Sequence, residues 1–259
     1  MTNQGRLLTL INQYHPDLVM LQEVRNFKRL KWLAARLLLP HYHFSPYGGT
    51  RSGIGILSRW PLGQVHVLSF HSGTQGKIAL AAPVYRPGSI LWACSVHLEA
   101  HHRYDIGRDF LHWGTFLWYE LFRSTPRYEQ VRELQAWLSR LSDSNWIIAG
   151  DFNTFPFSKV DRYLSRQFDD ALSQYPWGYL TGTYWALPGV PVNPRIDFIY
   201  HSPELRVAEA QVIQRKVSDH FPILAIFSLP ARDRDQPTPY TVKAALSASD
   251  TVHESRLQP

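Results

Sequence analysis

The sequence predicts a layered α+β (α/β) fold. Short apolar runs of strand length alternate with stretches that have the spacing of amphipathic helices. Some runs are apolar without alternation, such as Ile147-Ile148-Ala149, as expected for strands that are covered on both faces. Several of these runs stop at carboxylate, amide or histidine residues, and the strand ends of a layered fold can bring such side chains to one rim.

The composition is that of a globular domain with a sizeable core. Of the 259 residues, 44% are hydrophobic and nine are Trp, and the single Cys94 excludes an internal disulfide. No apolar run has the length of a membrane span, and the N-terminus lacks a signal-peptide pattern. We therefore expect a cytoplasmic monomer, with a leader or anchor upstream of the first residue left open.

The net charge of +6 and a sequence pI of about 9.5 favour polyanionic partners, such as nucleic acids or anionic membrane surfaces. A moderately basic protein without such a partner fits these values equally well.

The N-terminal part predicts two helices around a buried strand. The first helix ends at His15-Pro16-Asp17 and has its apolar stripe at Leu7, Leu10, Ile11 and Tyr14. The strand Leu18–Leu21 then stops at Gln22-Glu23. A basic helix follows, with its core stripe at Leu30, Leu33, Ala34 and Leu37.

The middle of the chain predicts further strands. Ile54–Arg59 is one, and Tyr42–Ser45 and Val65–Phe70 are weaker candidates. Lys77–Tyr85 and Ile90–Leu98 have the pattern of a hairpin. In its second strand, the alternation predicts that Cys94 is a packed core thiol and that His97 lies on the opposite face, at the strand end.

The aromatic stretch Gly114–Phe122 has two interpretations. We favour a helix packed on the core, because isolated apolar stretches are usually buried. An exposed lid or lipid-contacting loop is the alternative.

The C-terminal half continues the same pattern. Pro126 opens a helix whose buried stripe is Val131, Leu134, Leu138 and Leu141. The central strand then runs into Asp151-Phe152-Asn153, where alternation places Asp151 and Asn153 on one face. A short helix through Leu164 follows, and the expected later strands are Arg195–Tyr200, Val207–Ile213 and Ile223–Leu229.

Residues 231–259 lack periodicity and are rich in Ser, Thr, Ala, Pro and charge. We therefore expect one domain over residues 1–230 and a disordered C-terminal tail over 231–259.

Polar residues that suit one site recur where apolar runs stop: Glu23, His97, Asp151, Asn153, Asp197, Asp219 and His220. Oxygen ligands without cysteine suit Mg²⁺ or Mn²⁺ and not zinc. Two histidines can supply an acid and a base near neutral pH. No GxxxxGK loop is present, which argues against a P-loop NTPase.

An ordered set of motifs resembles the endonuclease/exonuclease/phosphatase superfamily, which has the DNase I-like fold. The motifs span about residues 7–229 and are Leu21-Gln22-Glu23-Val24, Gly53–Arg59, Ser95-Val96-His97-Leu98, Gly150-Asp151-Phe152-Asn153, Arg195-Ile196-Asp197-Phe198 and Ser218-Asp219-His220. The resemblance implies a four-layer α/β/β/α sandwich over residues 1–230.

The resemblance also implies roles for the site residues. The metal ligands would be Glu23, Asp151, Asn153 and Asp219, with Glu23 as the primary one. Asp151 would orient or deprotonate the attacking water, and Asn153 would bind a phosphate oxygen. His220, held by Asp197, would act beside the scissile phosphate, and His97 near the leaving-group oxygen. Which histidine is acid and which is base stays open.

One departure concerns the family's first strand, which carries an Asn that helps at the metal site. This chain begins almost directly with the helix that follows that strand, and Asn3 has no apolar strand before it. Three explanations stay open: a truncated chain, a misassigned start, or a first sheet that is short of this strand.

The function expected from the resemblance is Mg²⁺-dependent hydrolysis of phosphoester bonds. A phosphodiesterase or nuclease is favoured by the basic charge. A lipid-headgroup (sphingomyelinase-like) phosphodiesterase or phosphatase is the alternative, favoured by the aromatic stretch. A non-catalytic binding protein that retains the fold is a further possibility, motivated by the missing strand.

Overall fold

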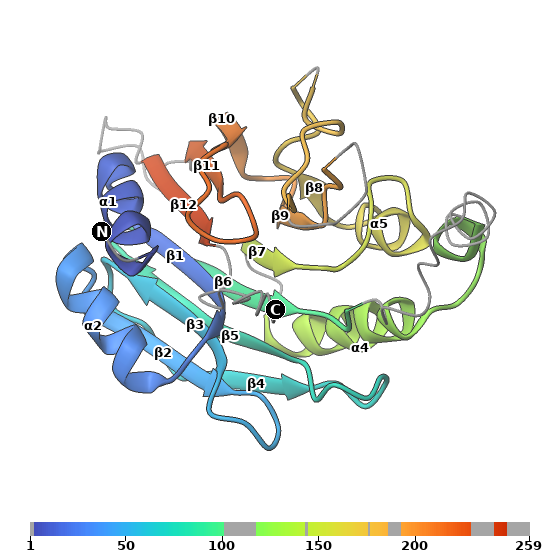
Figure 1. The fold of residues 1–259 in the computed structure, drawn as a ribbon, viewed down its shortest axis with the longest axis horizontal. Helices are drawn as coiled ribbons and strands as arrows, with labels where there is room; N and C mark the ends of the chain where they lie inside the picture. The colour runs from blue at the N-terminus through green and yellow to red at the C-terminus, as the bar shows by residue number, and fades with distance from the viewer. Residues whose placement is uncertain are drawn as a thin grey trace, which may run out of the picture.

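The computed structural model describes residues 3–100, 118–142, 145–175, 177–185, 193–228 and 241–247. Two six-stranded β-sheets lie between a pair of helices on one side and a pair on the other (Figure 1). This arrangement confirms the four-layer α/β/β/α sandwich.

The first sheet, sheet A, has the order β10-β11-β12-β1-β3-β2. Its strands are β1 (Leu18–Val24), β2 (His41–Pro46), β3 (Gly53–Ser58), β10 (Arg206–Val212), β11 (Ile223–Ser228) and β12 (Thr241–Ser247). The second sheet, sheet B, has the order β4-β5-β6-β7-β9-β8. Its strands are β4 (His66–Ser69), β5 (Ile78–Arg86), β6 (Ser89–His97), β7 (Trp146–Asp151), β8 (Asp169–Asp170) and β9 (Asp197–His201).

Alternating side chains of the buried strands build three apolar layers. In β1, Leu18 and Met20 face the core between the sheets, where Ile147 of β7 also packs. Val19 and Leu21 face the other way, against α1 (Asn3–Tyr14) and α2 (Phe27–Leu37). Ile148 of β7 packs under α4 (Pro126–Leu141) and α5 (Lys159–Leu164). Both faces of each central strand are thus covered, which explains their unbroken apolar sequence.

Several local expectations are confirmed. The hairpin is β5–β6, and Cys94 is buried and free. Pro126 lies in the first turn of α4, and the Thr125 side chain accepts a hydrogen bond from the Tyr128 N–H and so caps the helix. Of the described residues, no helix is long and apolar enough to cross a membrane.

The interpretation of the aromatic stretch needs correction. Residues 114–117 lie outside the described residues, and 118–122 are helical as expected. However, Trp118, Tyr119 and Phe122 are exposed, and the residue that this helical turn buries is Glu120. Glu120 is buried because it pairs with Arg127 and accepts a hydrogen bond from Thr154. A polar network, and not apolar packing, therefore anchors this turn.

The expectation of a disordered tail is wrong for residues 241–247. They form β12, which pairs with β1 in parallel and with β11 antiparallel. Backbone hydrogen bonds to two neighbouring strands hold this segment in place, and such bonds leave no signature in hydrophobic periodicity. Sheet A is therefore continuous from β11 through β12 to β1. β12, which comes much later in the sequence, occupies a place next to β1 in the sheet that was expected to lack a strand.

We expect the fold to depend on this strand. Ala244→Pro removes a backbone N–H from a strand with neighbours on both sides, whereas Ala244→Ser keeps it. The proline variant should lower the melting temperature by roughly 3–10 °C, since about 1 kcal/mol corresponds to 2–4 °C in a domain of this size. Thermal unfolding followed by circular dichroism measures this. Equal melting temperatures for the two variants would show that β12 contributes nothing to stability.

Candidate active site

Three expected site residues stand in a row across neighbouring strands of sheet B. His97 at the end of β6 is the register partner of Asp151 at the end of β7. Asp151 is in turn the register partner of Asp197 at the start of β9. The His97 Nε2 atom lies 3.6 Å from Asp151 Oδ2. Strand pairing alone therefore assembles residues that are far apart in sequence.

Gly150 makes this pairing possible. A Cβ atom at this position would lie 1.8 Å from the carbonyl oxygen of Val96 in the neighbouring strand. A side chain would therefore push β7 away from β6, directly before Asp151.

Asp151 and Asn153 meet by a turn and not by strand alternation. The strand ends at Asp151, and Asn153 has a left-handed backbone with φ of 49°. The Asn153 N–H donates to Asp151 Oδ1 at 2.9 Å, and its side-chain amide donates to the Leu98 carbonyl at 3.1 Å. The expectation of a shared strand face is thus wrong, because Asx-type hydrogen bonding ends the strand first.

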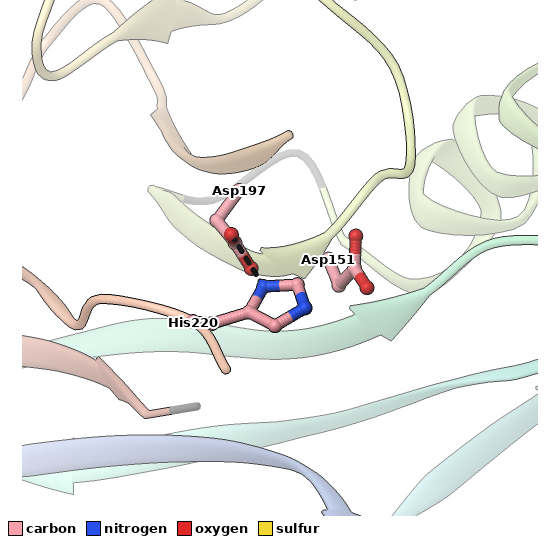
Figure 2. Close-up of side chains that lie close together, drawn as sticks. All are labelled: Asp151, Asp197 and His220. Atoms are coloured by element: carbon pink, nitrogen blue, oxygen red, sulfur yellow. Dashed lines mark hydrogen bonds and ion pairs between the residues drawn. The ribbon is translucent and has the colours of Figure 1, made fainter. Parts of the chain in front are cut away.

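His220 reaches the row from the other sheet. It lies in the turn before β11 of sheet A, and its Nδ1 is 2.8 Å from Asp197 Oδ2 (Figure 2). The Thr183 hydroxyl oxygen accepts the backbone N–H groups of Ile196 and Asp197, and the Thr183 carbonyl accepts the Phe221 N–H. One residue thus ties the start of β9 to the His220 turn.

Asp151, Asp197 and His220 form a buried group whose possible ligand atoms all lie within 4.8 Å of one another. Such a group could bind a divalent metal through its carboxylates, or through all three residues when His220 is deprotonated. Burial raises the pKa of Asp151 to about 7, and the Asp197 charge adds to this effect. Burial lowers the pKa of His220, but the negative charges of Asp197, Asp151 and Asp219 outweigh it and raise the pKa to about 10. The group therefore contains a weak acid that titrates near neutral pH next to a cationic imidazole.

Glu23 and Asp219 do not belong to this group. Glu23 has a left-handed backbone with φ of 53°, next to a register shift between Leu21 and Val24. Its backbone N–H donates to the Tyr47 hydroxyl at 3.0 Å. Asp219 accepts a hydrogen bond from Ser218 Oγ at 2.8 Å and raises the pKa of His220 through its charge. Glu23 and Asp219 thus approach the site from sheet A, at Tyr47 and His220 respectively.

His97 is buried, and both of its ring nitrogens have partners. Nδ1 lies 2.7 Å from Tyr47 Oη, and Nε2 lies 2.8 Å from Lys77 Nζ. Burial lowers the pKa of His97 well below its usual value, and the nearby Lys77 and His220 lower it further. His97 is therefore neutral at pH 7.

Sequence reasoning missed Tyr47, Lys77 and Thr183. The search for polar residues at strand ends considered carboxylates, amides and histidines only. Lys77 stands directly before an apolar strand and Tyr47 directly before Gly48-Gly49, so a search of strand boundaries for any polar residue could have found both. Thr183 carries no comparable signal, since it lies in a loop.

The arrangement has the parts for acid–base chemistry on an anionic substrate. Asp151 can accept a proton near neutral pH, while protonated His220 carries positive charge. Oxygen atoms of the carboxylates supply ligands for a hard cation.

Comparisons with solved structures agree with this fold. The catalytic domain of human nocturnin with bound sulfate has a TM-score of 0.65 at 21% identity, over 88% of this chain and 86% of that one. TDP2 from D. rerio with a single-strand DNA product has a TM-score of 0.66 at 20% identity, over 87% and 91%. A mannosyl-6-phosphatase from Bacteroides thetaiotaomicron has a TM-score of 0.63 at 18% identity, over 85% and 88%.

No curated protein sequence matches the chain. The model of the endonuclease/exonuclease/phosphatase family matches residues 2–220, which include every expected site residue. The ordered motifs, the four-layer sandwich and this match lead to one conclusion: the chain belongs to the endonuclease/exonuclease/phosphatase family of phosphoester hydrolases.

Proposed function

We propose that this protein is a Mg²⁺-dependent phosphodiesterase that acts on nucleic acid. The observation that carries the proposal is the buried group of Asp151, Asp197 and His220, in which a carboxyl with a pKa of about 7 lies beside a cationic imidazole. Burying charged groups costs free energy, so a buried cluster of them favours a functional role. Their pKa values also suit proton transfer near neutral pH.

His220 would stabilise the negative charge that develops on the phosphoryl group. Its Nδ1–H is held by Asp197, so Nε2–H is the donor that can face a phosphoryl oxygen. The pairing fixes the orientation of the ring and keeps it protonated at neutral pH. Because the donor is already in place, little reorganisation is needed as charge builds up.

Asp151 would take the proton of the attacking water. Its raised pKa makes it a better base than an exposed Asp, and the Asn153 N–H on Oδ1 leaves Oδ2 for this role. The Asn153 side-chain amide would use its second N–H on a phosphoryl oxygen, since the first is bonded to the Leu98 carbonyl.

The donor set fits a hard divalent cation. The buried carboxylates of Asp151 and Asp197 repel each other, and a bound cation would reduce this repulsion. A protonated His220 cannot ligate a metal, so Glu23, Asp151, Asn153 and Asp219 would supply oxygen ligands for Mg²⁺, or for Mn²⁺. When bound, the ion would neutralise charge on the phosphoryl oxygens and polarise the phosphorus centre.

Nucleic acid is the substrate class that the charge favours. The net charge of +6 attracts a polyanion. Among the structural neighbours, TDP2 holds a single-strand DNA product and nocturnin holds sulfate, an anion of phosphate-like shape. These neighbours support a phosphate-containing substrate, and the choice of nucleic acid rests on the charge.

A lipid-headgroup phosphodiesterase is the second candidate. Trp118, Tyr119 and Phe122 are exposed on one helical turn, and Arg123 lies over the Trp118 ring at 5.1 Å. Aromatic and basic side chains of this kind suit a lipid interface. Comparing hydrolysis of single-strand DNA with that of sphingomyelin vesicles separates the two candidates. A loss of lipid hydrolysis alone in Phe122→Ser would favour the second.

We expect Mg²⁺-dependent hydrolysis of bis(p-nitrophenyl) phosphate, abolished by EDTA. Asp151→Asn removes the base and a ligand, so kcat should fall by about 10²–10⁴ while the melting temperature changes little. The control is Asp169→Asn, the same change at an exposed position of β8. Full activity of Asp151→Asn would contradict the role of Asp151. Absence of turnover in the wild type would favour a binding protein.

We expect Asp197→Asn to show a pH-dependent loss of stability. The folded-state pKa of His220 is raised to about 10 from an ordinary value of 6.5, so the stabilisation by its partners is complete below pH 6.5 and is lost as the pH rises through 10. In EDTA, the difference in melting temperature between wild type and Asp197→Asn should therefore narrow from pH 7 to pH 10.

Asp169→Asn supplies the baseline for this measurement, since the same change there removes no partner of His220. A difference that stays constant over this pH range would mean that Asp197 does not hold a charged His220.

A further inference from the structure

Lys77, His97 and Tyr47 form a second buried polar group beside Asp151. The three residues come from different elements: Lys77 directly precedes β5, His97 ends β6, and Tyr47 directly follows β2. The Lys77 ammonium lies 2.8 Å from His97 Nε2 and 5.2 Å from the centre of the Tyr47 ring. The mechanism proposed above uses none of the three.

Donor and acceptor counting fixes the direction of these hydrogen bonds. An ammonium group has only donors, so His97 Nε2 accepts from Lys77. The neutral ring then carries its proton on Nδ1 and donates it to Tyr47 Oη. The Glu23 N–H donates to the same oxygen. His97 therefore has no free position, whereas Lys77 keeps two N–H donors and Tyr47 keeps its O–H donor.

The Lys77 ammonium has no close counterion among the described residues. The residue is 9% exposed, and none of the carboxylates in the described ranges lies within ion-pair distance of its ammonium group. Burial lowers the pKa of Lys77, while the charges of Glu23, Asp151 and Glu99 oppose this effect. A buried cation with one neutral hydrogen-bond partner is incompletely compensated, and an anionic ligand would complete it.

The loop before Lys77 is fixed by two carboxylates. Glu99 accepts the backbone N–H groups of Thr74 and Gln75, and Glu133 accepts those of His71 and Ser72. The Phe70 N–H also donates to the Lys77 carbonyl. Lys77 is thus held on an ordered backbone, as a preorganised binding residue requires.

We propose that Lys77 binds the phosphoryl group of the substrate directly, and that His97 is a positioning residue that holds Lys77 and Tyr47 with their remaining donors facing that group. The proposal deepens the function proposed above and rests on it. It also assigns His97 a role other than acting on the leaving-group oxygen, because both of its nitrogens are engaged. The ligand chemistry is that of a tetrahedral phosphate anion.

The test of Lys77 measures binding of inorganic phosphate by titration calorimetry, with Mg²⁺ and with EDTA. Lys77→Gln should weaken phosphate binding about 10- to 100-fold, because a charge-assisted hydrogen bond is lost. Lys31→Gln removes the same charge from the exposed face of α2 and should leave it unchanged. Lys77→Met serves if the glutamine variant is poorly folded, and circular dichroism checks both.

The test of His97 compares two replacements. The glutamine side chain in His97→Gln has one acceptor for Lys77 and one donor for Tyr47, so phosphate affinity and most of kcat should be retained. His97→Leu has neither and should lose phosphate affinity to the same extent as Lys77→Gln. Equal loss of kcat in both His97 variants, with phosphate affinity intact, would overturn the positioning role.

Further outcomes are decisive for Lys77. Phosphate binding that is absent in the wild type, or within twofold of wild type in Lys77→Gln, overturns the proposal. Tighter Mg²⁺ binding in Lys77→Gln with unchanged phosphate affinity also overturns it, because Lys77 would then only balance the carboxylates. Phosphate binding that depends on Lys77 in a protein without phosphoester turnover supports the anion site, while the proposed hydrolase function fails.

Discussion

The hydrogen bond between His220 and Asp197 is the contact on which the site depends, because it joins the two sheets at their common rim. Sheet B alone supplies the row His97, Asp151 and Asp197, and sheet A supplies the His220 turn. Thr183 binds both sides of this junction. Packing of the apolar core sets the distance between the sheets, so core packing and site geometry are coupled.

Strand register is the second constraint on the site. A shift of β7 by one residue against β6 would turn the side chains of β7 to opposite faces and separate Asp151 from its partners. The absence of a side chain at Gly150 permits the close approach, and the Asn153 turn ends the strand at the required residue. The backbone is left-handed at Glu23 and at Asn153, a conformation that residues other than glycine adopt uncommonly.

The parts of the structure that the sequence predicts are those with a local signature. Apolar periodicity identifies most strands and helices, and the carboxylates and histidines at strand ends identify the Asp151, Asp197 and His220 group. Lys77 and Tyr47 escape this reasoning because their importance comes from a hydrogen-bond chain between three separate elements. β12 escapes it because the pairing partners of its backbone lie in distant segments, and no apolar pattern marks it. Hydrophobic periodicity therefore does not predict backbone pairing between segments of this fold that are far apart in sequence.

The position of β12 in sheet A has a consequence for folding of the protein during its synthesis on the ribosome. β12 follows β1 and β11 in sequence but lies between them in space. At about 5–20 residues per second, synthesis of the chain from the end of β1 to the start of β12 takes roughly 10–40 s. For that time, β1 lacks its parallel neighbour, and the backbone N–H and C=O groups on that edge have no strand to pair with. Completion of sheet A is thus a late event, because it waits for the synthesis of residues 241–247.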